Sequence, residues 1–580
     1  MSAEPKLIVG IDLGTTYSLV AVLQAGVPVV LPNALGERLT PSAVSVLDDG
    51  RVVVGAAARA RAVLDPRNTA LAFKRDMGTE RLYELRGESF RPQQLSALIL
   101  AALKQDAEAA LGRPIEEAVV SVPAYFGELQ RQATRDAAAI AGLHVERIVN
   151  EPTAAALAYG LRAADNDQRV VVFDLGGGTL DVSVLEIVSG VIEVQATAGD
   201  VRLGGEDFTD ALAELAASRL DDDDRAELRE HPIGWARLRE ACEGAKRRLS
   251  TEPAATVDLP DLPFGPGRRS RLHQSITREQ AVDAWAPLLG RLRGPTERAL
   301  RDASLDPGRL DHVLLVGGAT RMPCIQHAVA GLFGRPPLCS LPPDEAVAMG
   351  AAVQAALKAR DSAVADMVVT DVAPFTMGIE SSVRMGSQFV GGVFAPILER
   401  GTVIPASRVK PFSTVADFQR TIHFKVFQGE HARCADNQQL GEYVLAKLPE
   451  LPAGKVSVEV RFTYDLNGIL EVDLTVGGTD RTETLVIERS PGRLTAEQVE
   501  QARQAMKRWK VHPREELPNL TALARAEALF VELIGPEREA LGQSIARLRY
   551  ALDRQDPVLI RQCRELLVAH TTQLLGGSEG

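Results

Sequence analysis

The sequence predicts a multidomain protein with an α/β domain over residues 1–360, a linker over 361–372, a β-sandwich over 373–490 and a short helical region with a disordered tail over 491–580. Apolar strand patterns alternate with helical patterns up to residue 360, which is typical of α/β architecture. Short strands with a period of two and regular turns follow, as in a β-sandwich. The periodicity of the last part is helical.

The clearest motif of the α/β part is a strand–turn–strand unit over Val170–Val184. Four apolar residues precede Asp174, three consecutive glycines follow at 176–178, and a second apolar strand then begins. Glycines in such a turn leave backbone N–H groups open to an anion, because no Cβ intervenes. Carboxylates such as Asp174 and Asp181 beside a phosphate site indicate a metal ion between them. An ordinary glycine-rich hairpin is the alternative interpretation of this stretch alone.

A second copy of the unit lies near the N-terminus, over Leu7–Val22. Asp12 corresponds to Asp174, and Gly14-Thr15-Thr16 corresponds to the three glycines. A repeated unit predicts two similar lobes whose hairpins clasp a phosphate chain, with both aspartates around one Mg²⁺. The sequence contains neither a P-loop nor a G-x-G-x-x-G motif that opens a helix, so neither of those nucleotide sites is supported.

Composition excludes several other classes of protein. The 580 residues are 45% hydrophobic and carry a net charge of −12, which argues against general nucleic-acid binding. The five cysteines form no C-x-x-C pair and the nine histidines form no zinc motif, as expected for reduced cytosolic thiols. No apolar run reaches the roughly 18 residues of a membrane span. We therefore expect a cytoplasmic protein with neither nucleic acid nor membrane as a partner.

Several charged residues have two interpretations at this stage. Lys74 is more often a surface charge than a catalytic group, and Glu151 is either a helix cap or a carboxylate aimed at water or metal. Glu243, Lys246, Arg247 and Ser250 share one helical face, which is either an exposed charged face or a site that binds a nucleoside.

Three further segments complete the α/β part. Gly317 and Gly318 follow a strand and open a helix, which favours an anion or a nucleotide. The acidic run Asp221–Asp224 is expected to be a solvated loop, and residues 252–276 an irregular β segment.

An ordered series of motifs resembles the DnaK-type, seventy-kilodalton heat-shock chaperones over about residues 5–510. The motifs are Gly10-Ile-Asp-Leu-Gly-Thr-Thr16, Val122-Pro-Ala-Tyr-Phe126, Asn150-Glu-Pro-Thr-Ala-Ala-Ala156, Asp174-Leu-Gly-Gly-Gly-Thr179, Leu203-Gly-Gly-Glu-Asp-Phe208, Val316-Gly-Gly-Ala-Thr-Arg-Met-Pro323, Phe412-Ser-Thr414 and Phe427-Gln-Gly-Glu430. The short C-terminal region and the linker look most like the HscC branch. The resemblance implies an actin-like ATPase domain, a peptide-binding β-sandwich and a helical lid, with ATP and Mg²⁺ as cofactors.

The resemblance also assigns roles by position in the motifs. Catalytic roles fall on Lys74, Glu151, Asp174, Thr179, Asp181 and Asp12, and Asp12 and Asp174 would hold Mg²⁺ mainly through water. The phosphates would lie against Gly14, Thr15, Thr16, Tyr17, Gly176, Gly177, Gly178, Thr179, Gly317 and Gly318. The adenosine would lie against Glu243, Lys246, Arg247, Ser250, Arg321 and Asp344.

The same resemblance implies protein partners. An extended apolar peptide of an unfolded client would bind at Ile379, Phe412, Val415, Ile422 and Phe424, although core packing is the alternative for each of them. A J-domain co-chaperone would use Arg147, Asn150 and Asp371. Whether a nucleotide-exchange factor takes part stays open.

The chain departs from the family pattern in its linker, where Val368-Val369-Thr370 is smaller and more polar than the usual leucine-rich segment. Ser382 replaces a common methionine, and the helical region is short, which leaves lid closure open. The alternatives to a general chaperone are a specialised regulator of few clients, a small-molecule kinase of the actin-like superfamily, and a filament-forming protein. The β-sandwich argues against the kinase.

Overall fold

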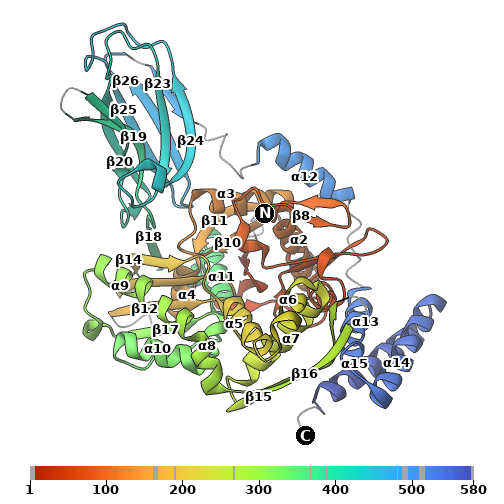
Figure 1. Cartoon of the computed structure of the whole chain (residues 1–580). Helices are drawn as coiled ribbons and strands as arrows, with labels where there is room; N and C mark the ends of the chain where they lie inside the picture. The colour runs from red at the N-terminus through yellow and green to blue at the C-terminus, as the bar shows by residue number, and fades with distance from the viewer. Residues whose placement is uncertain are drawn as a thin grey trace.

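The structure is a computed structural model that describes residues 7–160, 167–188, 191–265, 268–365, 367–385, 388–479, 481–485, 494–508 and 516–576. The expected boundary at residues 490 and 491 and the last four residues of the expected disordered tail lie outside the described residues. Figure 1 shows a large α/β body, a β-sandwich that projects from one end of it, and a helical bundle on the opposite side.

The first lobe of the α/β body is built on a mixed sheet in the order β11-β10-β1-β2-β3, with β4 paired to β2. Its strands are β1 (Ile8–Asp12), β2 (Tyr17–Gln24), β3 (Val27–Val30), β4 (Thr40–Pro41), β10 (Glu117–Val122) and β11 (His144–Asn150). Alternate residues face opposite sides of a strand, so Val9 and Ile11 pack with α2 (Pro92–Leu111) and α3 (Glu128–Ile140), while Ile8 packs on the other side.

The second lobe contains a sheet in the order β17-β12-β13-β14-β18-β21. Its strands are β12 (Gln168–Leu175), β13 (Leu180–Val188), β14 (Val191–Asp200), β17 (His312–Val316), β18 (Val368–Val372) and β21 (Val403–Ile404). Helices α4 (Glu151–Gly160) and α11 (Ala346–Lys358) pack together between the two lobes, because one apolar core contains residues of both sheets and both helices. Their many alanines permit this close packing.

Each lobe carries an extension beside the cleft between the sheets. The first has β5 (Ala43–Val46), β6 (Val52–Val54), α1 (Ala56–Arg61), β7 (Thr69–Leu71), β8 (Tyr83–Leu85) and β9 (Glu88–Phe90). The second has α5 (Gly205–Ala217), α6 (Asp222–Glu230), α7 (Pro232–Arg248), β15 (Ala254–Gly265), β16 (Arg268–Thr277), α8 (Arg278–Arg291), α9 (Arg293–Asp302) and α10 (Pro323–Phe333).

One of two expectations for the second extension was wrong. The acidic run does not form a loop, because Asp221 caps α6 by accepting a hydrogen bond from the backbone N–H of Asp224, and acidic residues are favourable in a first helical turn. The described part of residues 252–276 agrees with the expected irregular β segment, because β15 and β16 pair as a long antiparallel hairpin that contains two register shifts.

The β-sandwich consists of two four-stranded sheets, in the orders β20-β19-β23-β24 and β22-β25-β26-β27. Its strands are β19 (Met377–Met385), β20 (Gln388–Leu398), β22 (Ala406–Ser413), β23 (Ile422–Gln428), β24 (Gln438–Leu445), β25 (Ser457–Tyr464), β26 (Leu470–Val476) and β27 (Thr482–Leu485). Inward-facing residues of both sheets form one apolar core, and Leu129 of α3 packs into it from the α/β body.

The described residues of the C-terminal region, 494–508 and 516–576, form four helices. Helix α12 (Ala496–Arg508) begins at a capping box formed by Thr495 and Gln498 and packs on α3 (Figure 1). Helices α13 (Leu517–Phe530), α14 (Gly535–Arg554) and α15 (Pro557–Gly576) pack into a bundle. In this conformation the bundle lies on the α/β body, away from the sandwich (Figure 1). None of the described helices is both long enough and apolar enough to cross a lipid bilayer.

Candidate nucleotide site and interdomain contacts

The two predicted phosphate hairpins face each other across the cleft between the lobes. A Cβ on Gly177 would lie 1.9 Å from Thr16 Oγ1, and a Cβ on Gly178 would lie 2.5 Å from Thr15 Oγ1. Only glycine therefore permits this approach of the two turns. Thr15 is 7% exposed, so the facing turns form an enclosed cradle rather than a surface loop.

Lys74 and Glu151 form a buried ion pair at the base of this cradle. Lys74 Nζ lies 2.6 Å from Glu151 Oε1, and their side chains are 5% and 10% exposed. The ammonium also lies 5.6 Å from the centre of the Phe126 ring. A buried ammonium is stable only with a charged or hydrogen-bonded partner, so the interpretation of Lys74 as a surface charge is wrong.

Three further carboxylates surround this pair, those of Asp12, Asp174 and Asp181. Burial and the charge of Glu151 raise the pKa of Asp12 to about 7, although Lys74 and Ser121 oppose the shift. Burial and Glu151 likewise raise the pKa of Asp181 to about 8, and that of Asp174 lies well above its ordinary value. Negative charge therefore exceeds positive charge in a desolvated site.

The chemistry of this acidic cluster fits a divalent cation that is held in part by water. Asp174 Oδ2 is buried and has no hydrogen-bond partner among the described residues. Carboxylate oxygens suit Mg²⁺, which usually keeps several of its waters. Within the described ranges, no three His, Cys, Asp or Glu side chains are placed to hold a metal ion directly. The water-mediated role of Asp12 and Asp174, which the resemblance implies, stays a prediction.

The remaining predicted phosphate-site residues lie in or beside the same turns. The Gly14 N–H donates to Ser18 Oγ at 3.1 Å, and the Gly176 N–H donates to the Thr179 carbonyl at 3.1 Å, which closes each turn. Gly317 has a φ of +82°, and its N–H donates to the Pro343 carbonyl at 2.9 Å; Gly318 begins the following short helix.

The predicted adenosine residues form two ion-paired groups. On α7, Glu243 pairs with Lys246 at 2.6 Å and with Arg247 at 2.8 Å. Burial acts to raise the pKa of Glu243, but the two cations outweigh it and lower that pKa to about 2. In the other group, Arg321 Nη2 lies 2.6 Å from Asp344 Oδ2. These salt bridges fix the side chains in place before any ligand is bound.

Gly205 joins the two adenosine groups to the phosphate turn. A Cβ on Gly205 would lie 3.5 Å from Lys246 Nζ, 3.6 Å from Ala319 Cβ and 3.7 Å from the Gly176 carbonyl oxygen. Ser250 lies just beyond α7, and its hydroxyl donates to the Lys246 carbonyl at 3.4 Å. The structure therefore brings the residues predicted for phosphate and for adenosine into one region.

Contacts across the cleft include residues for which no role was predicted. Arg75 Nη2 donates to the Gly178 carbonyl at 3.1 Å and pairs with Asp207. Thr16 Oγ1 donates to Glu206 Oε1 at 3.0 Å. The Leu203-Gly-Gly-Glu-Asp207 turn was visible as a motif, but its contact with Arg75 joins distant segments and no local pattern indicates it.

Arg147, Asn150 and Asp371 meet where the linker joins the α/β body. Asn150 Nδ2 donates to Asp371 Oδ2 at 2.7 Å, and Thr153 Oγ1 donates to the same oxygen at 3.0 Å. Burial lowers the pKa of Arg147, while the charges of Asp371 and Asp465 oppose that shift. Asn150 and Asp371 are only 3% and 7% exposed, so in this conformation both side chains are buried in contacts within the chain.

The five predicted peptide-site residues do not share one environment in this conformation. Ile379 and Phe424 are each 2% exposed and belong to the sandwich core, which is the alternative that the sequence left open for them. Phe412 and Ile422 pack against the same core and are partly buried. Val415 is 43% exposed.

Comparison with known families places this arrangement among related proteins. A family model described as "Hsp70 protein" matches residues 8–535. The match confirms the predicted relationship at the level of the family, while the closer likeness to the HscC branch stays a prediction. Because the matched residues span both lobes, the linker, the sandwich and the first C-terminal helices, the chain belongs to the Hsp70 family.

Proposed function

We propose that this chain is an ATP-dependent chaperone in which slow ATP hydrolysis controls the binding of extended apolar peptides. As a member of the Hsp70 family, it belongs to a group of ATPase chaperones that use Mg²⁺ and work on unfolded polypeptides with J-domain co-chaperones. The α/β body is the actin-like ATPase domain, and the sandwich is the peptide-binding domain. The C-terminal helices correspond to the family's lid.

In this proposal the acidic cradle positions ATP and water. Mg²⁺ would be held by Asp12 and Asp174, mainly through water, and would neutralise charge on the phosphates. Lys74 orients the attacking water and stabilises the charge that develops on the γ-phosphate, and Glu151 orients Lys74 through their 2.6 Å contact. The reaction needs positioning rather than covalent chemistry, and a slow turnover suits a timer.

The observation that carries the chaperone function is a hydrogen-bonded sheet that continues from one domain into the other. Strand β18, which contains the divergent linker, pairs in parallel with β14 of the second lobe through Val368–Thr370. The same strand pairs antiparallel with β21, at the base of the sandwich, through Asp371 and Val372. A movement of the second lobe can therefore shift the sandwich directly.

A second connection begins at the nucleotide site. The Tyr125 N–H donates to Asp181 Oδ1 at 2.9 Å, and the Tyr125 ring lies 4.4 Å from the ring of Phe375, just beyond the linker. Nearby, Arg400 of the sandwich domain pairs with Asp302 of α9 at 3.1 Å. These contacts support a proposal in which a change at Asp181 is transmitted to the peptide-binding domain.

The nucleotide half of this proposal is tested by calorimetry with MgATP and by phosphate release in a single turnover of the full chain. Binding followed by slow release of phosphate supports an ATPase. Transfer of the phosphoryl group to a sugar would favour the kinase alternative instead. ATP-dependent sedimentation of the α/β body would favour the filament-forming alternative.

A further inference from the structure

The C-terminal bundle has an apolar core of its own. Ala522 and Ala526 of α13 pack against Leu541 and Leu548 of α14 and against Leu567 of α15. Polar contacts join the same helices, because Arg564 donates to Asn519 at 3.1 Å and Ser544 bonds to His570 at 3.0 Å. The bundle can therefore act on the rest of the chain as one unit.

One side of α13 is attached to the first lobe. Helix α13 packs along α1, and Leu520 contacts a small core formed by Ala43, Leu47, Val53 and Ala58. Arg525 Nη2 also donates to Glu37 Oε1 at 2.8 Å. An apolar contact and an ion pair together fix this end of the bundle to the first-lobe extension.

The end of α13 is attached to the second lobe through Arg237 of α7. Arg237 Nε and Nη2 donate to the two oxygens of Glu532 at 2.6 Å and 2.8 Å, and Nη2 also donates to the Val531 carbonyl at 3.0 Å. Its Nη1 donates to the Asp261 carbonyl at 2.7 Å. The Arg237 side chain is only 3% exposed and that of Glu532 is 26% exposed, so the guanidinium of this bidentate pair is buried while the carboxylate is partly exposed.

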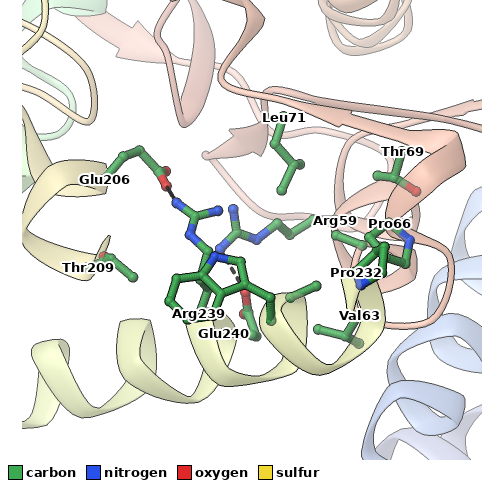
Figure 2. Close-up of a pocket in the computed structure, with 13 residues that line it drawn as sticks. Arg59, Val63, Pro66, Thr69, Leu71, Glu206, Thr209, Pro232, Arg239 and Glu240 are labelled. Carbon is green, nitrogen blue, oxygen red and sulfur yellow. Dashed lines mark hydrogen bonds and ion pairs between the residues drawn. The ribbon is translucent and has the colours of Figure 1, made fainter. Parts of the chain in front are cut away.

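These two attachments lie on opposite sides of the cleft entrance. Arg59 of α1 pairs with Glu240 of α7 at 2.7 Å, directly across the gap between the lobes. Beside that pair lies a cavity of about 260 Å³ with lining residues from both lobes, including Leu71 and Trp235 (Figure 2). The bundle thus bridges the same two helices that Arg59 and Glu240 connect.

Helix α7 connects the bundle to the candidate adenosine site. Arg237 precedes Glu243 by six residues, which is about 9 Å along a helix. Arg247, one turn further, donates to the hydroxyl of Tyr17 in the first lobe at 3.1 Å. If α7 moves away from the first lobe, Glu243, Lys246 and Arg247 move with it and the Arg247–Tyr17 contact breaks.

We infer that the C-terminal bundle is an intramolecular clamp that holds the two lobes together at the cleft entrance and so retards nucleotide release. The clamp residues are Leu520 and Arg525 toward the first lobe and Glu532 toward the second. The inference rests on the proposed nucleotide site but adds a role to helices that the family assigns to peptide covering. Opening of the cleft then requires the Arg237–Glu532 pair to separate or the bundle to leave α1.

The test is the dissociation rate of a fluorescent ADP analogue from the full-length chain, measured by stopped flow with excess unlabelled ADP. Glu532→Ala removes the second-lobe contact, and Leu520→Asp places a charge against the first-lobe core. Each variant should release the analogue about 5- to 150-fold faster, the usual range of coupling between sites. Amide hydrogen exchange should become faster in α13 of both variants.

Glu527→Ala is the matched control. It removes the same charge five positions earlier, within α13, but Glu527 pairs with Arg549 inside the bundle at 2.5 Å and does not connect the lobes. Its release rate should equal that of the unmodified chain. Unchanged or slower release in both clamp variants would overturn the clamp alone, provided that the unmodified chain binds the analogue. An unmodified chain that binds no ADP would overturn both the clamp and the nucleotide site.

Discussion

The amide of Asn150 donates a 2.7 Å hydrogen bond to the carboxylate of Asp371, which joins the end of strand β11 to the linker strand. Arg131 Nη2 donates to the other end of that amide, Asn150 Oδ1, at 2.6 Å. Asp371→Asn should weaken this junction, because an amide group replaces a charge that lies near two arginines. We predict that peptide no longer stimulates ATP hydrolysis in this variant, while ATP affinity is unchanged. Glu459→Gln, an exposed change on the sandwich, is the control.

Lys74 is the residue on which hydrolysis should depend most strongly. Lys74→Ala removes the ammonium that pairs with Glu151, so the γ-phosphate loses its stabilising charge. We predict a loss of about 10²- to 10³-fold in single-turnover hydrolysis, the usual effect of removing one electrostatic contact. ATP binding should persist by calorimetry. Turnover equal to that of the unmodified chain would remove Lys74 from the mechanism.

Replacing Asp174 by Asn should raise the thermal stability of the nucleotide-free protein but weaken its use of Mg²⁺. Asp174→Asn relieves the repulsion among several carboxylates in a buried site, so the nucleotide-free protein should melt about 1–2 °C higher for a gain of about 1 kcal/mol. The same variant should need more Mg²⁺ for half-maximal hydrolysis, because one metal-site carboxylate is lost. Differential scanning calorimetry and a Mg²⁺ titration measure the two effects. Asp223→Asn, at the exposed start of α6, should change neither.

Glu243 gives a prediction with a pH dependence. Lys246 and Arg247 lower its pKa from 4.5 to about 2, so its stabilising effect is complete above the unfolded-state value and is lost as the pH falls toward 2. Glu243→Gln should therefore lower the melting temperature by a constant amount between pH 6 and 8, and by less below about pH 4.5. Its adenosine affinity should also fall. A difference that grows at acid pH would contradict the assignment.

Local patterns predicted the hairpins of the nucleotide site, because an apolar strand followed by Asp-Leu-Gly and further small residues indicates a strand and a tight turn in both copies. The catalytic role of Lys74 came only from the resemblance, since a single charged residue has no distinctive pattern, and its ion pair with Glu151 was not predicted. Contacts between distant segments could not be predicted at all. Arg237 and Glu532 are separated by 295 positions, and neither lies in a motif that indicates a partner.

The helical start at Asp221 and the peptide-site residues show two other limits. A run of aspartates is polar enough for a loop, but its first residue can also cap a helix. Here Asp221 caps α6, and the following aspartates form the first turn of that helix. Alternation along β23 places Ile422 and Phe424 on one face of a strand. Sequence alone does not say whether that face lines a core or a cleft, and in this conformation Phe424 lies in the core.

The central claim is that nucleotide binding between the lobes controls peptide binding in the sandwich through strand β18. Its most direct test is the dissociation rate of a labelled apolar peptide from the full-length chain, first with ADP and then after addition of MgATP. The account predicts that MgATP speeds release by about 5- to 150-fold. Equal rates in the two nucleotides, with the peptide demonstrably bound, would contradict it, because the Val368–Val372 strand would then join the domains without coupling them.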